Sequence, residues 1–184
     1  MALVRGKVRI IGGLWRSRLL TFPANPDLRP TPDRIRETVF NWLGQDLTGL
    51  SCLDLFAGSG ALGFEAASRG ASQVVMVDTD SKIYNALHEN KEKLQATQVE
   101  LKMINALNFL NSDMRKFDVI FLDPPYRLEL LPKLLPLLPP HLEKGGLVYT
   151  ETKGTWAADN QWHVKHSAKA GAVYYQLLEL ELNG

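Results

Sequence analysis

The chain has 184 residues, 45% of them hydrophobic and 22% charged, which is typical of one globular domain with its own core. Its only cysteine, Cys52, excludes an intramolecular disulfide and favours a reducing, cytoplasmic setting. No apolar run reaches the ~20 residues of a membrane span, and the basic N-terminus lacks the apolar core of a signal peptide. We therefore expect a cytoplasmic protein that does not span a membrane.

The net charge of +1 conceals a division along the chain. The first 50 residues carry eight Lys or Arg and four Asp or Glu, a net charge of +4, and the rest carries −3. A solvated basic surface would explain this excess, and so would an arm that binds nucleic acid.

The N-terminal third predicts a hairpin followed by a helix. Residues 7–22 contain two strand-like runs on either side of Gly12 and Gly13, a turn dipeptide. A proline-rich connector, 23–32, follows. Thr31 is then predicted to cap a helix whose first residue is Pro32 and which ends at Gly44 or Gly49.

From residue 51 onward, strands and helices alternate. The pattern predicts a parallel sheet with helices on both faces. The predicted strands are 51–56, 72–78, 99–104, 117–123 and 146–152, and the predicted helices are 60–69, 81–95 and 105–112. Two prolines leave 128–140 open between a broken helix and a loop, and two tail segments, 161–166 and 173–182, predict an antiparallel pair.

The stretch GSGALG at residues 58–63 is a glycine loop that follows a strand and opens a helix. Asp78 ends the next strand, where an acid would bind a ribose hydroxyl pair. A dinucleotide and S-adenosylmethionine both contain adenosine, so these residues fit either cofactor. Asp54, just before the loop, favours S-adenosylmethionine, because a carboxylate there would repel a pyrophosphate and attract a cationic ligand.

The quartet DPPY, residues 123–126, directly follows a buried strand. Asp123 and the carbonyl of Pro124 can each accept one N–H of an exocyclic base amine, and Tyr126 offers a ring for base stacking. The amine would then attack a methyl group in line, with the sulfonium as leaving group, so that positioning supplies most of the rate.

These motifs, together with RIIGGLWRSRLL, RPTPDRIRETVFNWL and AGAVYYQL, resemble the bacterial RsmD family over nearly the whole chain. The resemblance implies a single-domain, Rossmann-like class I methyltransferase of α/β class. Its seven-stranded, mostly parallel sheet would have one antiparallel strand at its edge and an N-terminal β-hairpin extension. It also implies methylation of the exocyclic N2 of one guanine in 16S ribosomal RNA.

The resemblance assigns roles to particular residues. It implies catalytic contacts from Asp123, Pro124 and Tyr126. Separately, the residues themselves lead us to expect no metal. The S-adenosylmethionine contacts that the resemblance implies are Asp54, Phe56, Ala57, Gly58, Ser59, Gly60, Asp78, Asn105 and Ala106.

The substrate is expected to be 16S RNA in the 30S subunit or a late assembly intermediate, bound by a monomer. Residues 1–30 would form a basic RNA-docking arm and residues 31–184 the methyltransferase domain. The candidate phosphate contacts are Arg5, Lys7, Arg9, Arg16, Arg18, Arg34 and Arg36.

Three other functions stay open. A DNA adenine-N6 methyltransferase also uses DPPY, but usually needs an added target-recognition segment. A nicotinamide-dependent oxidoreductase needs a proton-transfer residue that we do not find, and a non-catalytic RNA-binding assembly factor would not need an intact DPPY.

Three further residues have simpler explanations. Cys52 is expected to fill the core. His163 and His166 would face opposite sides of a strand, which disfavours a metal site. Trp15 could stack on a base or pack on the domain.

Overall fold

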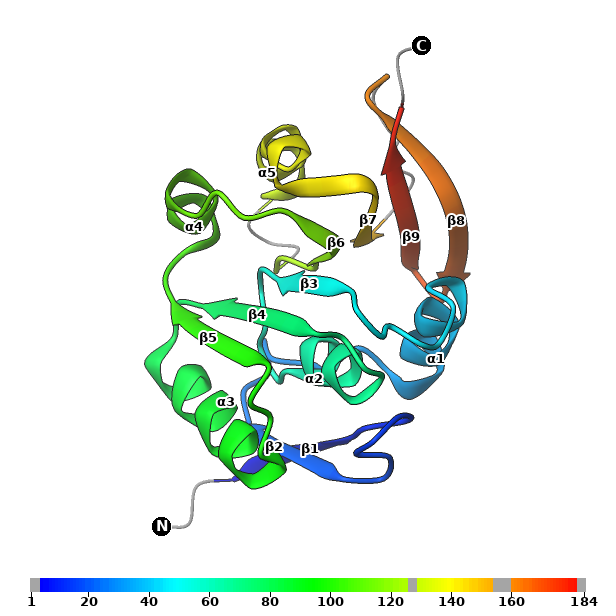
Figure 1. Ribbon diagram of the computed structural model, residues 1–184. Helices are drawn as coiled ribbons and strands as arrows, with labels where there is room; N and C mark the ends of the chain where they lie inside the picture. The colour runs from blue at the N-terminus through cyan, green and yellow to red at the C-terminus, as the bar shows by residue number, and fades with distance from the viewer. Residues whose placement is uncertain (1–3, 126–128, 154–159, 182–184) are drawn as a thin grey trace.

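The computed structural model describes residues 4–125, 129–153 and 160–181. Its centre is a seven-stranded sheet with the strand order β5-β4-β3-β6-β7-β9-β8 (Figure 1). The strands are β3 (Ser51–Asp54), β4 (Gln73–Asp78), β5 (Val99–Met103), β6 (Phe117–Leu122), β7 (Leu142–Lys153), β8 (Trp162–Ala170) and β9 (Val173–Leu180). The predicted alternation and the antiparallel tail pair are both confirmed.

One detail of the expected topology is wrong. The strand that runs against the others, β9, pairs antiparallel with both β7 and β8, so it lies inside the sheet and not at its edge. The edge strand is β8, which leads into the turn at Gly171, and β9 returns from that turn. This order pairs both edges of the more apolar strand, β9. It leaves β8, which alternates exposed and half-buried residues, at the edge of the sheet.

Helices cover both faces of the sheet (Figure 1). One core cluster lies under α1 (Asp33–Trp42), α2 (Ala61–Ser68) and α3 (Ser81–Leu94), and a second lies under α4 (Ala106–Ser112) and α5 (Leu131–Leu134). Neighbouring strand residues divide between the two clusters: Cys52 belongs to the first and Leu53 to the second. Cys52 is therefore core filler, and burial raises the pKa of its thiol to about 12.

The helices test two local predictions, the form of the proline-containing segment and the cap of α1. The proline-containing segment forms a broken helix, in which α5 is followed by the short 3₁₀ turns η2 (Leu135–Leu137) and η3 (Pro139–His141). The predicted cap of α1 is wrong. Pro32 occupies the N-cap position, and the Thr31 hydroxyl instead donates to Glu151. Among the described residues, no helix combines the length and the apolar character needed to cross a membrane.

The N-terminal hairpin is present, as β1 (Arg5–Arg9) and β2 (Leu19–Pro23). Its connection is longer than a turn at Gly12-Gly13, because residues 11–15 pack against the end of α2. The amide of Leu14 donates to Ser68 O at 2.8 Å, and a Cβ on Gly13 would lie 2.0 Å from the same oxygen. Gly13 is thus required for close backbone approach.

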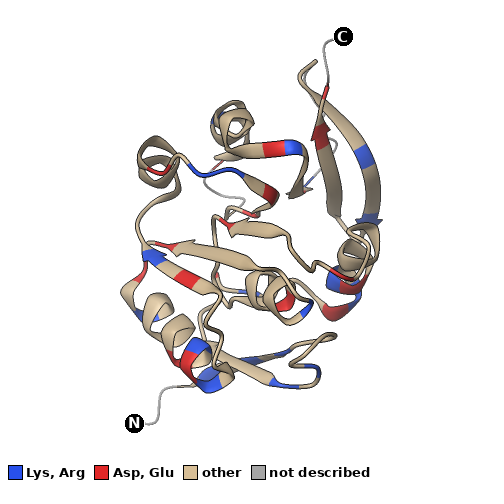
Figure 2. Cartoon of the chain, in the orientation of Figure 1, with Lys and Arg blue, Asp and Glu red and all other residues tan. Residues whose placement is uncertain are grey.

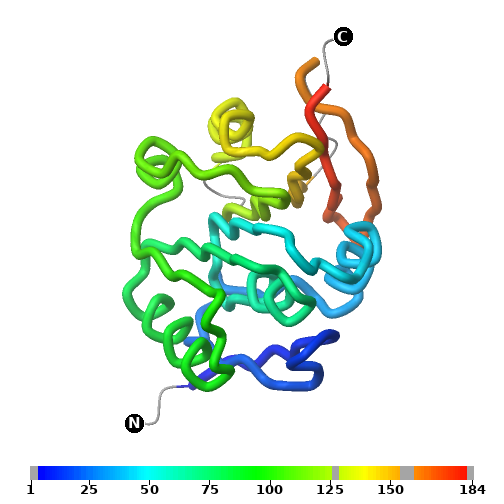
Figure 3. Tube along the Cα trace, viewed as in Figure 1, coloured from blue at the N-terminus to red at the C-terminus, as the bar shows by residue number. Residues whose placement is uncertain are grey.

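The hairpin belongs to the same hydrophobic core as the sheet. Val8 and Leu20 are buried in the cluster that contains α1, α2 and α3. Figure 3 shows the hairpin beside α3, where Thr21 and Asn90 exchange two hydrogen bonds across 69 positions of the chain. The division into an arm, 1–30, and a domain, 31–184, stays a functional prediction.

Candidate functional site

The carboxyl ends of three neighbouring strands bring three aspartates to one edge of the sheet. Asp54 ends β3, Asp78 ends β4 and Asp123 directly follows β6. Since β4 and β6 flank β3 in the sheet, the three predicted carboxylates converge there, as is usual for ligand sites in open α/β sheets.

The glycine loop between β3 and α2 has the conformation that its glycines permit. Gly58 and Gly60 have φ values of 53° and 83°, in the left-handed region. A Cβ on Gly60 would lie 2.6 Å from the ring of Phe64, so a side chain there would also clash. At the N-terminus of α2, Ala57, Ser59 and Gly60 are buried, while Phe56 and Gly58 are half-buried.

Asp54 is buried, with 2% of its surface exposed, and its Oδ2 accepts the Gly63 amide at 3.1 Å. It therefore holds the first turns of α2 against β3. Burial raises the pKa of Asp54 from 3.8 to about 7, and the charge of Asp78 adds to this effect. A cationic ligand beside it would favour the ionised form, which fits the ammonium and sulfonium groups of S-adenosylmethionine.

Asp78 braces the glycine loop from the next strand. Its Oδ2 accepts the Gly58 amide at 3.0 Å and its Oδ1 accepts the Asp80 amide at 3.1 Å. Burial raises its pKa, while these amide hydrogen bonds act in the opposite direction. The half-buried carboxylate has lone pairs left for a ribose, because it offers about four acceptor positions.

Asn105 and Ala106 lie close to Asp78. The amide of Ile104 donates to Asp78 O at 3.2 Å, and Asn105 caps α4 by accepting the Asn108 amide at 2.8 Å. Their proposed contact with the cofactor stays a prediction, but the structure places them beside the other predicted cofactor residues.

The described part of DPPY consists of a half-buried Asp123, a buried Pro124 and an exposed Pro125. Tyr126 lies outside the described residues. Burial raises the pKa of Asp123 well above the usual range of a carboxyl group, and the charges of Glu151 and Asp54 add to that effect. A carboxylate in such a place gains stability from an N–H donor, which the target amine would supply.

Sequence reasoning missed Glu151, which lies near Asp123 on β7, the strand beside β6. Its Oε1 accepts the hydroxyls of Thr31 and Tyr149 at 3.2 and 2.5 Å. The available signal was an acid at the end of a strand next to DPPY.

Leu28 was also missed by sequence reasoning. Its Cδ1 lies 2.8 Å from where a Gly58 Cβ would be, so the connector lies against the glycine loop.

Six of the seven predicted phosphate contacts are exposed, and Figure 2 shows Lys and Arg along the hairpin with charges of both signs on the adjoining α3. Arg5 pairs with Glu89 at 3.2 Å, and Arg18 donates to Lys93 O at 3.2 Å. The exposed residues are Arg5, Lys7, Arg9, Arg16, Arg18 and Arg34.

The prediction for Arg36 is wrong. Its side chain is fully buried and donates to Thr31 O, Arg9 O, Asp33 and Glu65, so it cannot reach a phosphate. Position 36 falls on the core face of α1, one residue after the buried Ile35. Trp15 is buried as well, which decides for packing over base stacking.

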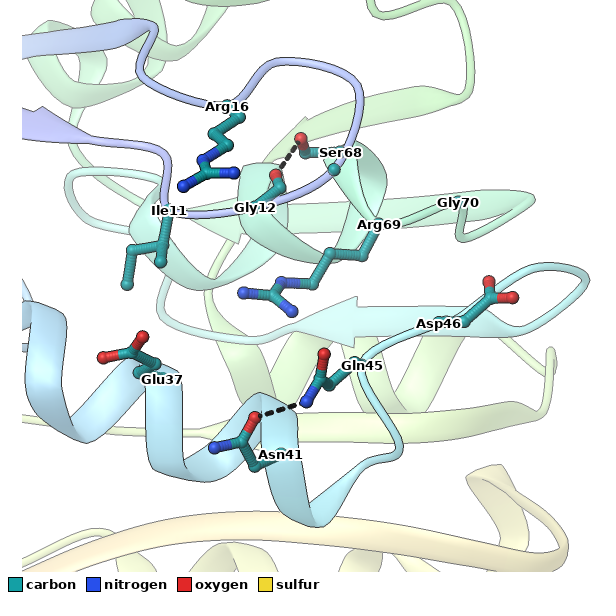
Figure 4. Close-up of a pocket in the computed structure, with 11 residues that line it drawn as sticks. Ile11, Gly12, Arg16, Glu37, Asn41, Gln45, Asp46, Ser68, Arg69 and Gly70 are labelled. Atoms are coloured by element: carbon teal, nitrogen blue, oxygen red, sulfur yellow. Dashed lines mark hydrogen bonds between the residues drawn. The ribbon is translucent and has the colours of Figure 1, made fainter.

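A polar groove of about 900 Å³ lies at the C-terminal end of α2, away from the glycine loop and the DPPY motif. Figure 4 shows the guanidinium group of Arg69 near the hydrogen-bonded pair Gln45 and Asn41, with Arg16 farther from that pair. Because α2 begins at the glycine loop and ends here, the helix, about 12 Å long, lies between the groove and the glycine loop.

The two histidines of the tail have separate environments. His166 stacks on Trp42 with ring centroids 5.2 Å apart, and His163 lies 3.7 Å from Glu181. Within the described ranges, no group of three His, Cys, Asp or Glu could hold a metal ion.

Comparison with known proteins agrees with this geometry. The family model "Conserved hypothetical protein 95" matches residues 8–179. The ribosomal RNA small subunit methyltransferase D of Escherichia coli K12 is 39% identical, over 97% of this chain and 93% of that protein. Its Haemophilus influenzae counterpart is also 39% identical, over 95% of both chains.

Solved structures agree with the fold. The structure "Putative methyltransferase yhhF from Escherichia coli" has a TM-score of 0.85 and 39% identity, over 96% of this chain and 99% of that chain. An RNA methyltransferase from Salinibacter ruber in complex with S-adenosyl-L-homocysteine has a TM-score of 0.65 at 18% identity, over 81% of this chain and 92% of that chain, and shares the fold.

These comparisons confirm the predicted methyltransferase fold and, at the level of that fold, S-adenosylmethionine as the cofactor. Near-complete coverage at 39% identity also confirms the resemblance read from the N-terminal and DPPY motifs. The chain belongs to the RsmD family of ribosomal RNA small subunit methyltransferases.

Proposed function

We propose that this protein methylates the exocyclic N2 of one guanine in 16S ribosomal RNA, within the 30S subunit or a late assembly intermediate. It acts as a monomer in the cytoplasm and uses S-adenosylmethionine. The observation that carries the proposal is the position of Asp123 and Pro124 at the end of β6, next to β3 and its glycine loop.

The residues around the loop fit the cofactor. The left-handed Gly58 and Gly60 form the tight turn between β3 and α2, and Asp54 supplies a buried carboxylate beside it. When bound, S-adenosylmethionine supplies a methyl group whose leaving group is a neutral thioether.

Asp123 and the Pro124 carbonyl each accept one N–H of the target amine. This aims the nitrogen lone pair at the methyl carbon and offsets its delocalisation into the ring. A C–N bond forms, the C–S bond breaks, and the nitrogen loses one proton. The methylated nitrogen is acidic enough to release that proton to water or to Asp123.

The six exposed basic residues supply phosphate contacts, with affinity that falls as salt rises. A domain of this size recognises a shaped site better than a long sequence, and it takes a splayed base to Asp123 and Pro124.

The test offers labelled S-adenosylmethionine with three substrates: protein-free small-subunit RNA, 30S particles that lack the modification, and duplex DNA. Mass spectrometry of the digested product identifies the base. We expect N2-methylguanosine from a ribosomal substrate and no product from DNA.

Each other function predicts a different result. N6-methyladenine in DNA would establish the DNA methyltransferase. Firm binding of S-adenosylhomocysteine with no methylation of any substrate would favour an assembly factor. A calorimetric titration in which NADH binds and S-adenosylhomocysteine does not would favour an oxidoreductase.

A further inference from the structure

Glu151 occupies the position next to Asp123 across two paired strands. Parallel pairing joins Phe121 to Tyr149 and Leu122 to Thr150, so that Asp123 and Glu151 follow in the same register at the carboxyl edge. Adjacent strands lie about 4.8 Å apart, and residues two positions apart share a face. Both carboxylates therefore lie on the face that carries Phe121 and Tyr149.

Two hydroxyls fix the orientation of Glu151. Tyr149, which is fully buried, donates to Oε1 at 2.5 Å, and Thr31, just before α1, donates to the same oxygen at 3.2 Å. Glu151 is itself half-buried, so part of its surface still faces outward. Its charge contributes to the raised pKa of Asp123, which agrees with their proximity.

The hydrogen-bonding groups of the bases determine which base the carboxylates of Asp123 and Glu151 can bind. Guanine presents two donors side by side on its Watson–Crick edge, N1–H and the N2 amine. Adenine presents an amine beside N1, which is an acceptor. A carboxylate offers acceptors only, so a pair of carboxylates matches guanine and repels the N1 lone pair of adenine.

We propose that Glu151 accepts the N1–H of the target guanine while Asp123 holds its N2 amine, which makes Glu151 a residue that selects guanine over adenine. This rests on the proposed function. The N1–H bond stays intact throughout. The bond that forms is N2–CH₃, and the proton that leaves comes from N2.

The experiment compares guanosine with 2-aminopurine at the methylated position, built into small-subunit RNA by splinted ligation once mass spectrometry has located that position. 2-Aminopurine keeps the 2-amine but has an unprotonated N1. The wild-type protein should favour guanosine by ~100-fold or more in kcat/KM, because 2-aminopurine leaves the acceptor oxygen of Glu151 facing the lone pair of N1.

In Glu151→Gln the amide can rotate to donate to that N1. The preference for guanosine should then fall to within ~10-fold, with S-adenosylhomocysteine affinity unchanged. Glu151→Asp keeps the carboxylate and should keep the preference at a lower rate. The matched control is Glu143→Gln, an exposed acid at the start of the same strand, which should behave as wild type.

An unchanged preference in folded Glu151→Gln would overturn the proposal, as would a Glu151→Asp that loses it. Failure of the proposed function is distinct from both outcomes, because then the wild-type protein itself would form no N2-methylguanosine on any ribosomal substrate.

Discussion

The guanidinium of Arg36 and the carboxylate of Glu65 form an ion pair of 3.2 Å in which both side chains are completely buried. Glu65 also accepts the amides of Ile11 and Gly12 at 2.8 and 3.0 Å and pairs with Arg69 at 3.1 Å. One carboxylate on α2 therefore joins α1 to the N-terminal segment that follows β1.

Replacing Arg36 with Met should destabilise the protein strongly. It would leave Glu65 with one of its two cationic partners, and breaking a buried pair costs about 3–5 kcal/mol of unfolding free energy. Urea denaturation measures the change. The control is Arg34→Met, an exposed position on the same helix, with an expected change within about 0.5 kcal/mol. Equal effects of the two substitutions would contradict a stabilising role of the buried pair.

RNA docking by the hairpin is best tested with point substitutions. Deleting residues 1–20 would remove Val8, Ile10 and Trp15 from the core and two amides from Glu65, so it would test folding as well as docking. The substitution Lys7→Gln with Arg9→Gln and Arg16→Gln should instead weaken RNA binding with little change in stability. The slope of log affinity against log salt should become shallower by about 1 for each lost phosphate contact.

The matched control for the hairpin is the set Lys116→Gln, Lys133→Gln and Lys144→Gln, three exposed lysines far along the chain. Binding is measured by filter retention across a salt series, and S-adenosylhomocysteine affinity should stay constant in both sets. If the three control substitutions made the slope of log affinity against log salt as shallow as the hairpin substitutions do, docking by the hairpin would be refuted.

Asp123 should control methyl transfer and its pH dependence. Asp123→Ala should abolish transfer and leave S-adenosylhomocysteine affinity nearly intact, while Asp123→Asn should keep measurable activity through its amide oxygen. Because the pKa of Asp123 is raised, the wild-type carboxyl ionises only above the usual acidic range. The single-turnover rate should therefore rise with pH through that raised pKa.

Asp123→Asn should lack this rise, since an amide does not titrate. The rate of the variant is measured over the same pH series as the wild-type rate. A variant that keeps the wild-type pH limb would assign the limb to another group, and a variant as inactive as Asp123→Ala would show that the negative charge itself is needed.

Asp54 should make the ligand-free protein less stable as pH rises from about 4 to about 7. With its pKa raised from 3.8 to about 7, the folded state keeps a proton that the unfolded chain releases in this range. The unfolded state then binds fewer protons, so the unfolding free energy falls with increasing pH and levels off above the folded pKa. Asp123 contributes in the same direction.

Asp54→Asn should flatten this dependence, because its side-chain oxygen still accepts the Gly63 amide but does not ionise. Thermal or urea unfolding of both proteins between pH 4 and about 8 gives the comparison. Identical slopes would mean that Asp54 does not ionise within this range.

The sequence by itself determined the order of strands and helices, the glycine loop, the DPPY motif and the family. These features are local, because the alternation of apolar runs and the position of Gly58, Asp78 and Asp123 at strand ends are written in consecutive residues. Parallel strands place their carboxyl ends at one edge, so the pattern puts the three aspartates at the same edge, while the strand order β4-β3-β6 makes them neighbours there.

Only the tertiary structure decided that Arg36 is buried, that Gly13 packs on Ser68, that β9 lies between β7 and β8, and that Glu151 stands beside Asp123. Each of these depends on contacts between segments far apart in the chain. An arginine on a helix looks the same in sequence whether it faces water or a buried carboxylate, and Glu65, 29 positions away, makes that difference. Packing between distant elements sets the local environment, and the local environment sets what a charged side chain can do.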